Sequence, residues 1–370
     1  LMCIHKTYIG SYGTIFLMPS HIEKLLENIP NEKIDLEQLI HNQPWVIEKN
    51  HNCIISPDSD GFLCGLLMST YFNWKIVGFY DGKTLLSRKD IKISECIFLD
   101  VEIFNKNIRS IGNHCVIPHN KIYEELGENK LEQCISPGLL RGFDGNTYFR
   151  LKYPLGTIHL LLSIIFPYIK IDLPDKGIAS LLFPDGLFNV LFNYPENVLT
   201  WFGYLDFENK NHPMNKYIYE SNLNNQSFSL GEIMNFMREY FIKRDTFGEG
   251  IPGRGDHLKP VTESKREKDI TLIKSQDGLY RIRDDIQEKI KGFISMNALN
   301  CNFDFNRDSW SWNELRLIKF EKQIVGGEGK KYNQTLLRDA FSRNIVSGAQ
   351  TAANRFEYSY SDNLDIFNSV

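Results

Sequence analysis

Short apolar segments that end in aspartate constrain the fold of this chain more than any other feature of its sequence. The segments are residues 53–55, 75–80 and 96–99. The aspartates that follow them are Asp58, Asp60, Asp81 and Asp100. Between the first two segments, residues 62–68 have leucines on one helical face. Strands that alternate with a helix are typical of an α/β fold, in which helices flank a parallel sheet.

The aspartates are the first candidates for a binding site, because ligands gather beyond the carboxyl ends of parallel strands. Asp58 and Asp60 lie two residues apart, and a loop lets both reach one point. Hard divalent cations bind several carboxylate oxygens at close range. The alternative is a turn in which the Asp58 side chain caps the helix that begins near residue 62. Asp100 ends an apolar run, where a carboxylate is costly to desolvate unless it is paired or metal-bound.

His114 adds an imidazole a short distance along the chain, in residues 111–116. Carboxylates with one imidazole form a ligand set that suits manganese, magnesium or zinc. Two such ions, about 3.5–4 Å apart, can activate water and stabilise the leaving oxygen of a phosphodiester. The pattern therefore favours metal-dependent phosphoester chemistry.

Four segments, taken in order, resemble motifs of the DHH phosphoesterases, which cleave phosphodiesters with manganese. They read SPDSDGFLCGLL, CIFLDVE, IGNHCV and GIASLLFPDGLF and lie within residues 50–205. The resemblance implies a DHH-like fold that holds one or two Mn²⁺ or Mg²⁺ ions, with Asp100 and His114 at the catalytic centre. The metal ligands that it implies are Asp58, Asp60, Asp100, His114 and Asp185.

The chain departs from the family pattern at two places. Family members carry a His or Asp shortly before the Asp-x-Asp pair, where this chain has Ile54 and Ser56. The Asp-His-His signature reads Gly112-Asn113-His114, so Asn113 still offers an amide oxygen whereas Gly112 has no side chain that can bind metal. Two further histidines are considered as substitutes, and they are His119 and His159.

Substrate contacts are expected from four residues, which are Arg109, Asn113, His159 and Lys330. Arg109 lies between the second and third motifs, where its charge would offset that of a phosphate. Lys330 belongs to VGGEGKK, the stretch nearest to the glycine-rich GGGH-like motif with which family members grip phosphate. Glycines there expose backbone N–H groups to an anion. A simple surface turn is the alternative.

Changes in composition predict four units along the chain. Residues 1–50 form an N-terminal extension that packs on the core, and residues 51–205 form the DHH-like domain. Residues 206–265, richer in Asn, Gly, Lys and Asp, form a helix and an exposed connector. Residues 266–370 form a smaller α+β C-terminal domain.

Charge and cysteine content indicate the cellular compartment of the protein and the partners that it can bind. The net charge of −4 argues against a protein whose whole surface clamps duplex DNA. The seven cysteines are scattered and form no CxxC pair, which is typical of reduced thiols. Neither an 18-residue apolar run nor a signal-peptide pattern is found in the sequence. These features predict a cytoplasmic protein without membrane contact.

Three hypotheses on function follow. The first is a divergent metal-dependent phosphodiesterase, acting on a nucleic acid end, a short oligonucleotide or a cyclic nucleotide. The second is a catalytically degenerate, DHH-like subunit that binds nucleotides or nucleic acid, with the C-terminal region serving self-association or a partner subunit. The third is a phosphatase of the haloacid-dehalogenase type with Asp58 as nucleophile, which lacks a matching downstream lysine.

Overall fold

The structure is a computed structural model. It describes residues 26–27, 29, 32–114, 124, 130–145, 148–219, 229–248, 255–306, 309–327, 334–352, 354–363 and 367.

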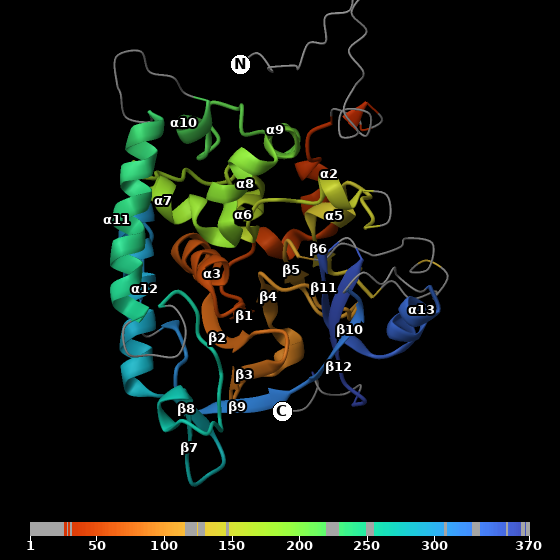
Figure 1. Cartoon of the computed structure of the whole chain (residues 1–370), viewed down its shortest axis with the longest axis vertical. Coiled ribbons are helices and arrows are strands. Elements are labelled where there is room, and N and C mark those ends of the chain that lie inside the picture. The colour runs from red at the N-terminus through yellow and green to blue at the C-terminus, as the bar shows by residue number, and fades with distance from the viewer. Residues whose placement is uncertain are drawn as a thin grey trace, which may run out of the picture.

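The described strands form a mixed sheet of nine strands in the order β6-β5-β4-β1-β2-β3-β9-β8-β7 (Figure 1). The parallel part consists of β1 (Asn52–Ile55), β2 (Lys75–Tyr80), β4 (Ile97–Leu99), β5 (Ser110–Ile111) and β6 (Cys134–Ile135). The antiparallel part consists of β3 (Thr84–Arg88), β9 (Leu315–Lys319), β8 (Tyr280–Ile282) and β7 (Leu272–Lys274). The predicted α/β class, with a largely parallel core, is therefore confirmed.

The central strands are continuous apolar runs because both faces of the sheet are covered. In β1, Cys53 and Ile55 pack into the helical layer, whereas Ile54 faces a second cluster on the other side. Helix α3 (Ser59–Phe72) returns from β1 to β2, and α6 (Thr157–Ile165) packs against it.

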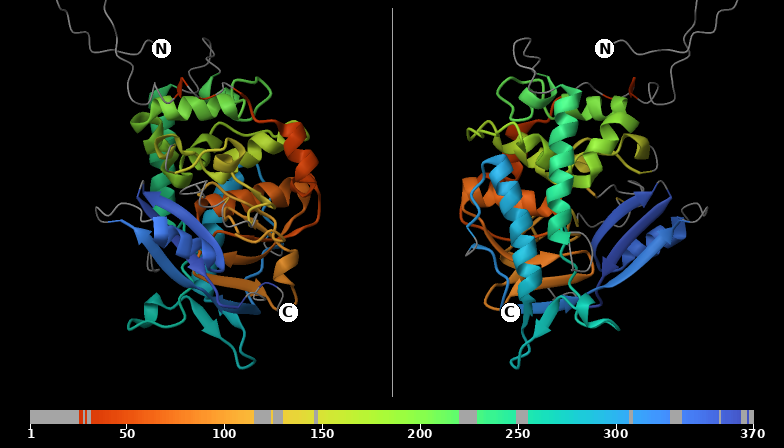
Figure 2. Two further views of the ribbon diagram at one scale, coloured as in Figure 1. Left: turned by 90° about the vertical axis from the view of Figure 1, so that its right-hand side faces the viewer. Right: turned by 60° about the vertical axis from the view of Figure 1, so that its left-hand side comes forward.

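The remaining helices complete the covering layer. They are α2 (Leu36–Asn42), α5 (Pro137–Leu140), α7 (Gly177–Leu182), α8 (Leu187–Asn193), α9 (Pro195–Tyr204), α10 (Asn215–Ile218), α11 (Leu230–Gly248) and α12 (Asp284–Cys301). Helices α11 and α12 run side by side at one end of this layer (Figure 2). Within the described residues, no helix combines the length and the apolar character needed to cross a membrane.

A second sheet, small and antiparallel, lies beside the parallel strands. It consists of β10 (Glu321–Gly326), β12 (Arg355–Tyr360) and β11 (Ile345–Ala352), and α13 (Gln334–Ser342) packs on it. The hydroxyl group of Tyr80, at the end of β2, lies 2.8 Å from the hydroxyls of both Ser347 and Ser359. The N–H group of Phe104 donates to the Val346 carbonyl at 2.9 Å. The small sheet is thus attached at the carboxyl edge of the parallel strands.

The two sheets do not correspond to the units predicted from the sequence. Strands β7 to β9 come from residues 272–319, yet they extend the sheet that begins at residue 52. The second sheet is drawn from residues 321–360. A boundary at residue 266 therefore does not separate the two sheets, because β9 pairs directly with β3.

Candidate functional site

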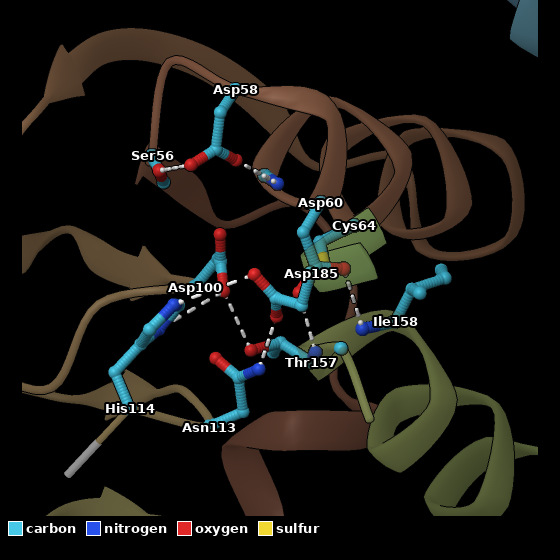
Figure 3. Close-up of polar contacts among 12 residues, drawn as sticks. Ser56, Asp58, Asp60, Cys64, Asp100, Asn113, His114, Thr157, Ile158 and Asp185 are labelled. Carbon is cyan, nitrogen blue, oxygen red and sulfur yellow. Dashed lines mark hydrogen bonds and ion pairs between the residues drawn. The ribbon is translucent and has the colours of Figure 1, made fainter. Parts of the chain in front are cut away.

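The carboxyl ends of three neighbouring parallel strands bring the predicted acidic residues together. Asp58 follows β1, Asp100 follows β4 and His114 follows β5, and these strands are adjacent in the order β5-β4-β1. Asp60 lies in the first turn of α3, and Asp185 comes from the short 3₁₀ turn η4 (Pro184–Gly186) after α7. Figure 3 shows these side chains gathered around one space.

Asp58 has two structural contacts. Its carboxylate accepts hydrogen bonds from the Gly61 N–H at 3.2 Å and from the Ser56 hydroxyl at 2.8 Å. It therefore caps α3, as the alternative interpretation predicted, and it also lines the cavity at this edge. Gly61 is required by the tight turn, because a Cβ atom there would lie 2.1 Å from the Ser56 carbonyl oxygen.

Asp60 uses both carboxylate oxygens to hold the start of α6. The oxygens accept the backbone N–H groups of Thr157 at 2.5 Å and Ile158 at 3.0 Å. These N–H groups lie in the first turn of α6, where the helix itself offers no acceptor. The carboxylate is 1% exposed. Burial, with repulsion from Asp185 and Asp58, raises its pKa to about 7.

Asp100 has one satisfied and one unsatisfied oxygen. Asp100 is 2% exposed, and its backbone is in the left-handed region with φ of 61°. Oδ1 accepts a hydrogen bond from the Thr157 hydroxyl at 2.7 Å, whereas Oδ2 has no hydrogen-bond partner among the described residues. Burial, then repulsion from Asp60 and Asp58, raises the pKa of Asp100 well above its usual range.

Asp185 is held by an amide and an imidazole. Its carboxylate accepts a hydrogen bond from the side-chain amide of Asn113 and lies 3.6 Å from His114 Nε2. The other ring nitrogen of His114 lies 3.8 Å from Asp100 Oδ1. Desolvation opposes the charge of His114, but Asp185 outweighs this effect, and the pKa rises to about 10. Desolvation likewise opposes the charge of Asp185, yet His114 and Asn113 hold its pKa below the usual value.

The side-chain amide of Asn113 is held in place by two acceptors. Its Nδ2 atom also donates to the Leu155 carbonyl at 2.8 Å, so both amide hydrogens have acceptors. The Oδ1 atom is buried and has no hydrogen-bond partner in the described part of the chain. Asn113 and Asp100 thus each have a buried oxygen without a hydrogen-bond partner among the residues that the structure describes.

Glu102 was not singled out from the sequence, although it lies at the site. It is 2% exposed, lines the cavity and adds to the negative charge that acts on His114. A Cβ atom on Gly112 would lie 2.6 Å from Glu102 Cδ and 2.7 Å from Glu102 Oε2. Glu102 therefore fills the space that a side chain at position 112 would take.

A cavity of about 210 Å³ opens between this edge and the small sheet. Asp58, Asp100 and His114 line one wall, and Lys322 of β10 lines the other. Lys322 is paired with Glu357 of β12 at 2.8 Å. His257, from the stretch predicted to be an exposed connector, also lines the cavity. Burial lowers the pKa of His257, and the charge of Asp58 opposes this shift.

The structure does not bring every predicted residue to the site. Arg109 precedes β5, and so lies at the amino edge of the parallel strands, where its charge acts on His51. His159 is fully buried within α6, where burial lowers its pKa to about 4, and it does not line the cavity. Lys330 and His119 lie outside the described residues.

The residues present fit a hard divalent cation in their chemistry. Four aspartates share one space, and two of them have raised pKa values through burial and mutual repulsion. Two buried oxygens have no hydrogen-bond partner among the described residues. In the described ranges, however, no three His, Cys, Asp or Glu side chains form a group ready to hold an ion. Binding would therefore require some of these side chains to move closer together.

Comparisons of the chain with profiles of known protein families, with curated proteins and with solved structures found no match.

Proposed function

We propose that the chain is a divergent, DHH-type, metal-dependent phosphoesterase. Its substrate would be a nucleic acid end, a short oligonucleotide or a cyclic nucleotide. The observation that carries the proposal is the Oδ2 atom of Asp100, a buried carboxylate oxygen that lacks a hydrogen-bond partner among the described residues. Asp100 lines the same cavity as Asp58 and His114. An anion buried in this way is costly unless a cation neutralises it.

The ion would be Mn²⁺ or Mg²⁺, one or two in number, held by the oxygens of Asp58, Asp100 and Asp185. Bound there, it would supply a water of lowered pKa and would polarise the phosphoryl oxygens. The chain's own residues prepare the site. Thr157 orients Asp100 through its hydroxyl group. His114, whose pKa is raised to about 10, is a cation at neutral pH that can bind a phosphate oxygen.

A binding subunit that no longer hydrolyses its ligand is the second candidate. Two observations favour it. Both oxygens of Asp60 already hold the start of α6, which limits what they can offer an ion. Gly112 provides no ligand, and Glu102 occupies the adjacent space. Such a subunit would keep the cavity and bind nucleotide or nucleic acid without turnover.

One experiment separates the two candidates. Metal-depleted full-length protein is given Mn²⁺ or Mg²⁺ and tested with bis-p-nitrophenyl phosphate, labelled oligonucleotides and cyclic nucleotides. Turnover that requires metal and is lost in Asp100→Asn supports the phosphoesterase. The exposed Asp172 provides the control, because Asp172→Asn removes the same charge far from the cavity lining. Binding without turnover supports the binding subunit, and absence of both rejects the two proposals.

A further inference from the structure

The segment around His257 is fixed against the Asp58 loop, although the two are almost 200 residues apart. The Leu258 N–H group donates to the Pro57 carbonyl at 2.8 Å. Leu258 is 1% exposed, and Asp256 on the other side of His257 is 2% exposed. Gly255 packs so closely on the end of α11 that a Cβ atom there would lie 2.6 Å from Phe247. His257 is therefore presented by an anchored backbone.

The imidazole of His257 faces the acidic cavity. It is half-buried and lines the cavity together with Asp58 and Asp100. The charges that act on it come from Asp58, Asp256 and Asp81 on the acidic side and from Lys259 on the basic side. The hydrogen bond from Leu258 to Pro57 places His257 next to the Asp58 loop, and both residues line the same cavity.

The acidic cluster consequently has an imidazole at each end. At one end, His114 lies within 4 Å of Asp100 and Asp185, at 3.8 and 3.6 Å. At the other end, His257 accompanies Asp58 in the cavity wall. The unpartnered Oδ2 atom of Asp100 points toward Asp58 rather than toward His114 (Figure 3). Oxygen donors are thus available on the side where His257 lies.

We infer that His257 is the nitrogen donor for a divalent metal ion bound at the Asp58 end of the cavity. The inference rests on the proposed function for the carboxylate site and adds a ligand from outside its motifs. Asp58 and Asp100 Oδ2 supply the oxygen donors at this end. An imidazole nitrogen added to carboxylate oxygens favours a transition-metal ion such as Mn²⁺ or Zn²⁺ over Ca²⁺, which prefers oxygen alone.

The test measures nitrogen coordination directly, with Mn²⁺ as the probe and the full chain as the protein. Electron spin echo modulation of bound Mn²⁺ detects ligating ¹⁴N, and histidine labelled with ¹⁵N assigns the signal to imidazole. Titration calorimetry gives the number of ions and each Kd. We expect the wild type to bind two ions. In His257→Ala, the ion at the Asp58 end should either be lost together with its nitrogen signal or bind with a Kd raised at least tenfold. The control is His41→Ala, since His41 is exposed in α2.

The possible outcomes are distinct. Two ions and an unchanged nitrogen signal in His257→Ala would overturn the inference and leave the proposed function standing. If the wild type binds a single ion and His114→Ala loses it, the inference is also overturned and the proposed function again stands. No Mn²⁺ binding by the wild type would overturn both. His257→Gln, which keeps a polar side chain of similar length without imidazole, repeats the test if the alanine variant does not fold.

Discussion

The hydroxyl group of Thr157 donates a hydrogen bond of 2.7 Å to Oδ1 of Asp100. The backbone N–H of the same threonine donates to Asp60. One residue at the start of α6 therefore holds two carboxylates that follow different strands. The orientation of the acidic cluster depends on where this helix begins.

Thr157→Val should weaken both folding and metal binding. Valine keeps the shape but removes the hydroxyl donor, so a buried carboxylate oxygen loses its partner. The free energy of unfolding should fall by about 1–3 kcal/mol, as measured by denaturant unfolding. Thr157→Ser restores the donor and is the matched control. No loss in Thr157→Val, or a larger loss in Thr157→Ser, would show that the hydrogen bond to Asp100 does not hold the cluster.

Asp100→Asn should make the metal-free protein more stable while it abolishes the response to metal. The amide oxygen can still accept from Thr157, and asparagine tolerates the left-handed backbone. Removing a buried charge should raise the Tm at pH 8 by roughly 2 °C or more. Added Mn²⁺ should raise the Tm of the wild type only. A Tm below that of the wild type in metal-free buffer would contradict the repulsion argument.

In the metal-free wild type, the contribution of Asp60 and Asp100 to stability should fall as the pH rises from about 4 to about 7. Burial raises the pKa of Asp60 from 3.8 to about 7, and the pKa of Asp100 is raised in the same direction. A carboxyl group whose pKa is higher in the folded chain binds its proton more tightly there, so folding weakens once that proton is lost.

The slope of this pH dependence provides the check. It should be shallower in Asp100→Asn than in the wild type, and unchanged in the exposed control Asp172→Asn. His114 contributes in a different window. Its pKa is raised from 6.5 to about 10, so its stabilisation is complete below pH 6.5 and is lost as the pH approaches 10. The buried His159, whose pKa is lowered to about 4, adds stability as the pH rises from about 4 to about 7 in every variant. Equal slopes in Asp100→Asn and in the wild type would therefore refute the pKa direction for Asp100.

Gly112→Ala should destabilise the protein through Glu102. The new Cβ atom would lie 2.6 Å from the Glu102 side chain, which is buried and has little room to move. A loss of about 1–3 kcal/mol is expected. The double variant Gly112→Ala/Glu102→Ala should recover part of this loss, and a double-mutant cycle measures the coupling. Additive losses would mean that the two positions do not compete for space.

Tyr80→Phe should loosen the small sheet without disturbing the large one. The phenol oxygen lies 2.8 Å from the hydroxyl groups of Ser347 and Ser359. Loss of these bonds should cost about 1 kcal/mol and speed amide exchange in β11 and β12. Tyr168→Phe is the control, because Tyr168 is 47% exposed. Uniform acceleration across both sheets would argue against a local attachment role.

The parallel half of the fold is predictable from local patterns. Residues 75–80 form β2 with the predicted bounds, and the strand predicted at 53–55 is one residue longer. These strands are apolar on both faces, so composition alone marks them. Strands β7 and β8 were not predicted, because they are three residues long and only partly buried. β8 takes its place in the sheet by pairing with β9, and β7 by pairing with β8. No local sequence pattern predicts the pairing with β9.

The candidate site is predictable only where its residues end strands. Asp58, Asp100 and His114 meet because parallel strands share a carboxyl edge. Arg109 precedes its strand, and the same rule sends it to the opposite edge. Glu102 lies in the same loop after β4 as Asp100, so the strand-end rule could have found it. His257 reaches the cavity through tertiary packing, and spacing in the sequence gives no signal for it.

The pairing of β3 with β9 has a consequence for how the chain can be produced. Thr84 of β3 lies opposite Lys319 of β9, so the sheet cannot close until residues far along the chain have been synthesised. Contacts over such separations slow folding, because a long loop must be closed before the pairing is gained. A fragment that ends before residue 315 would leave β3 as an open apolar edge, which promotes aggregation. Expression of the acidic cluster in isolation therefore requires residues from nearly the whole length of the protein.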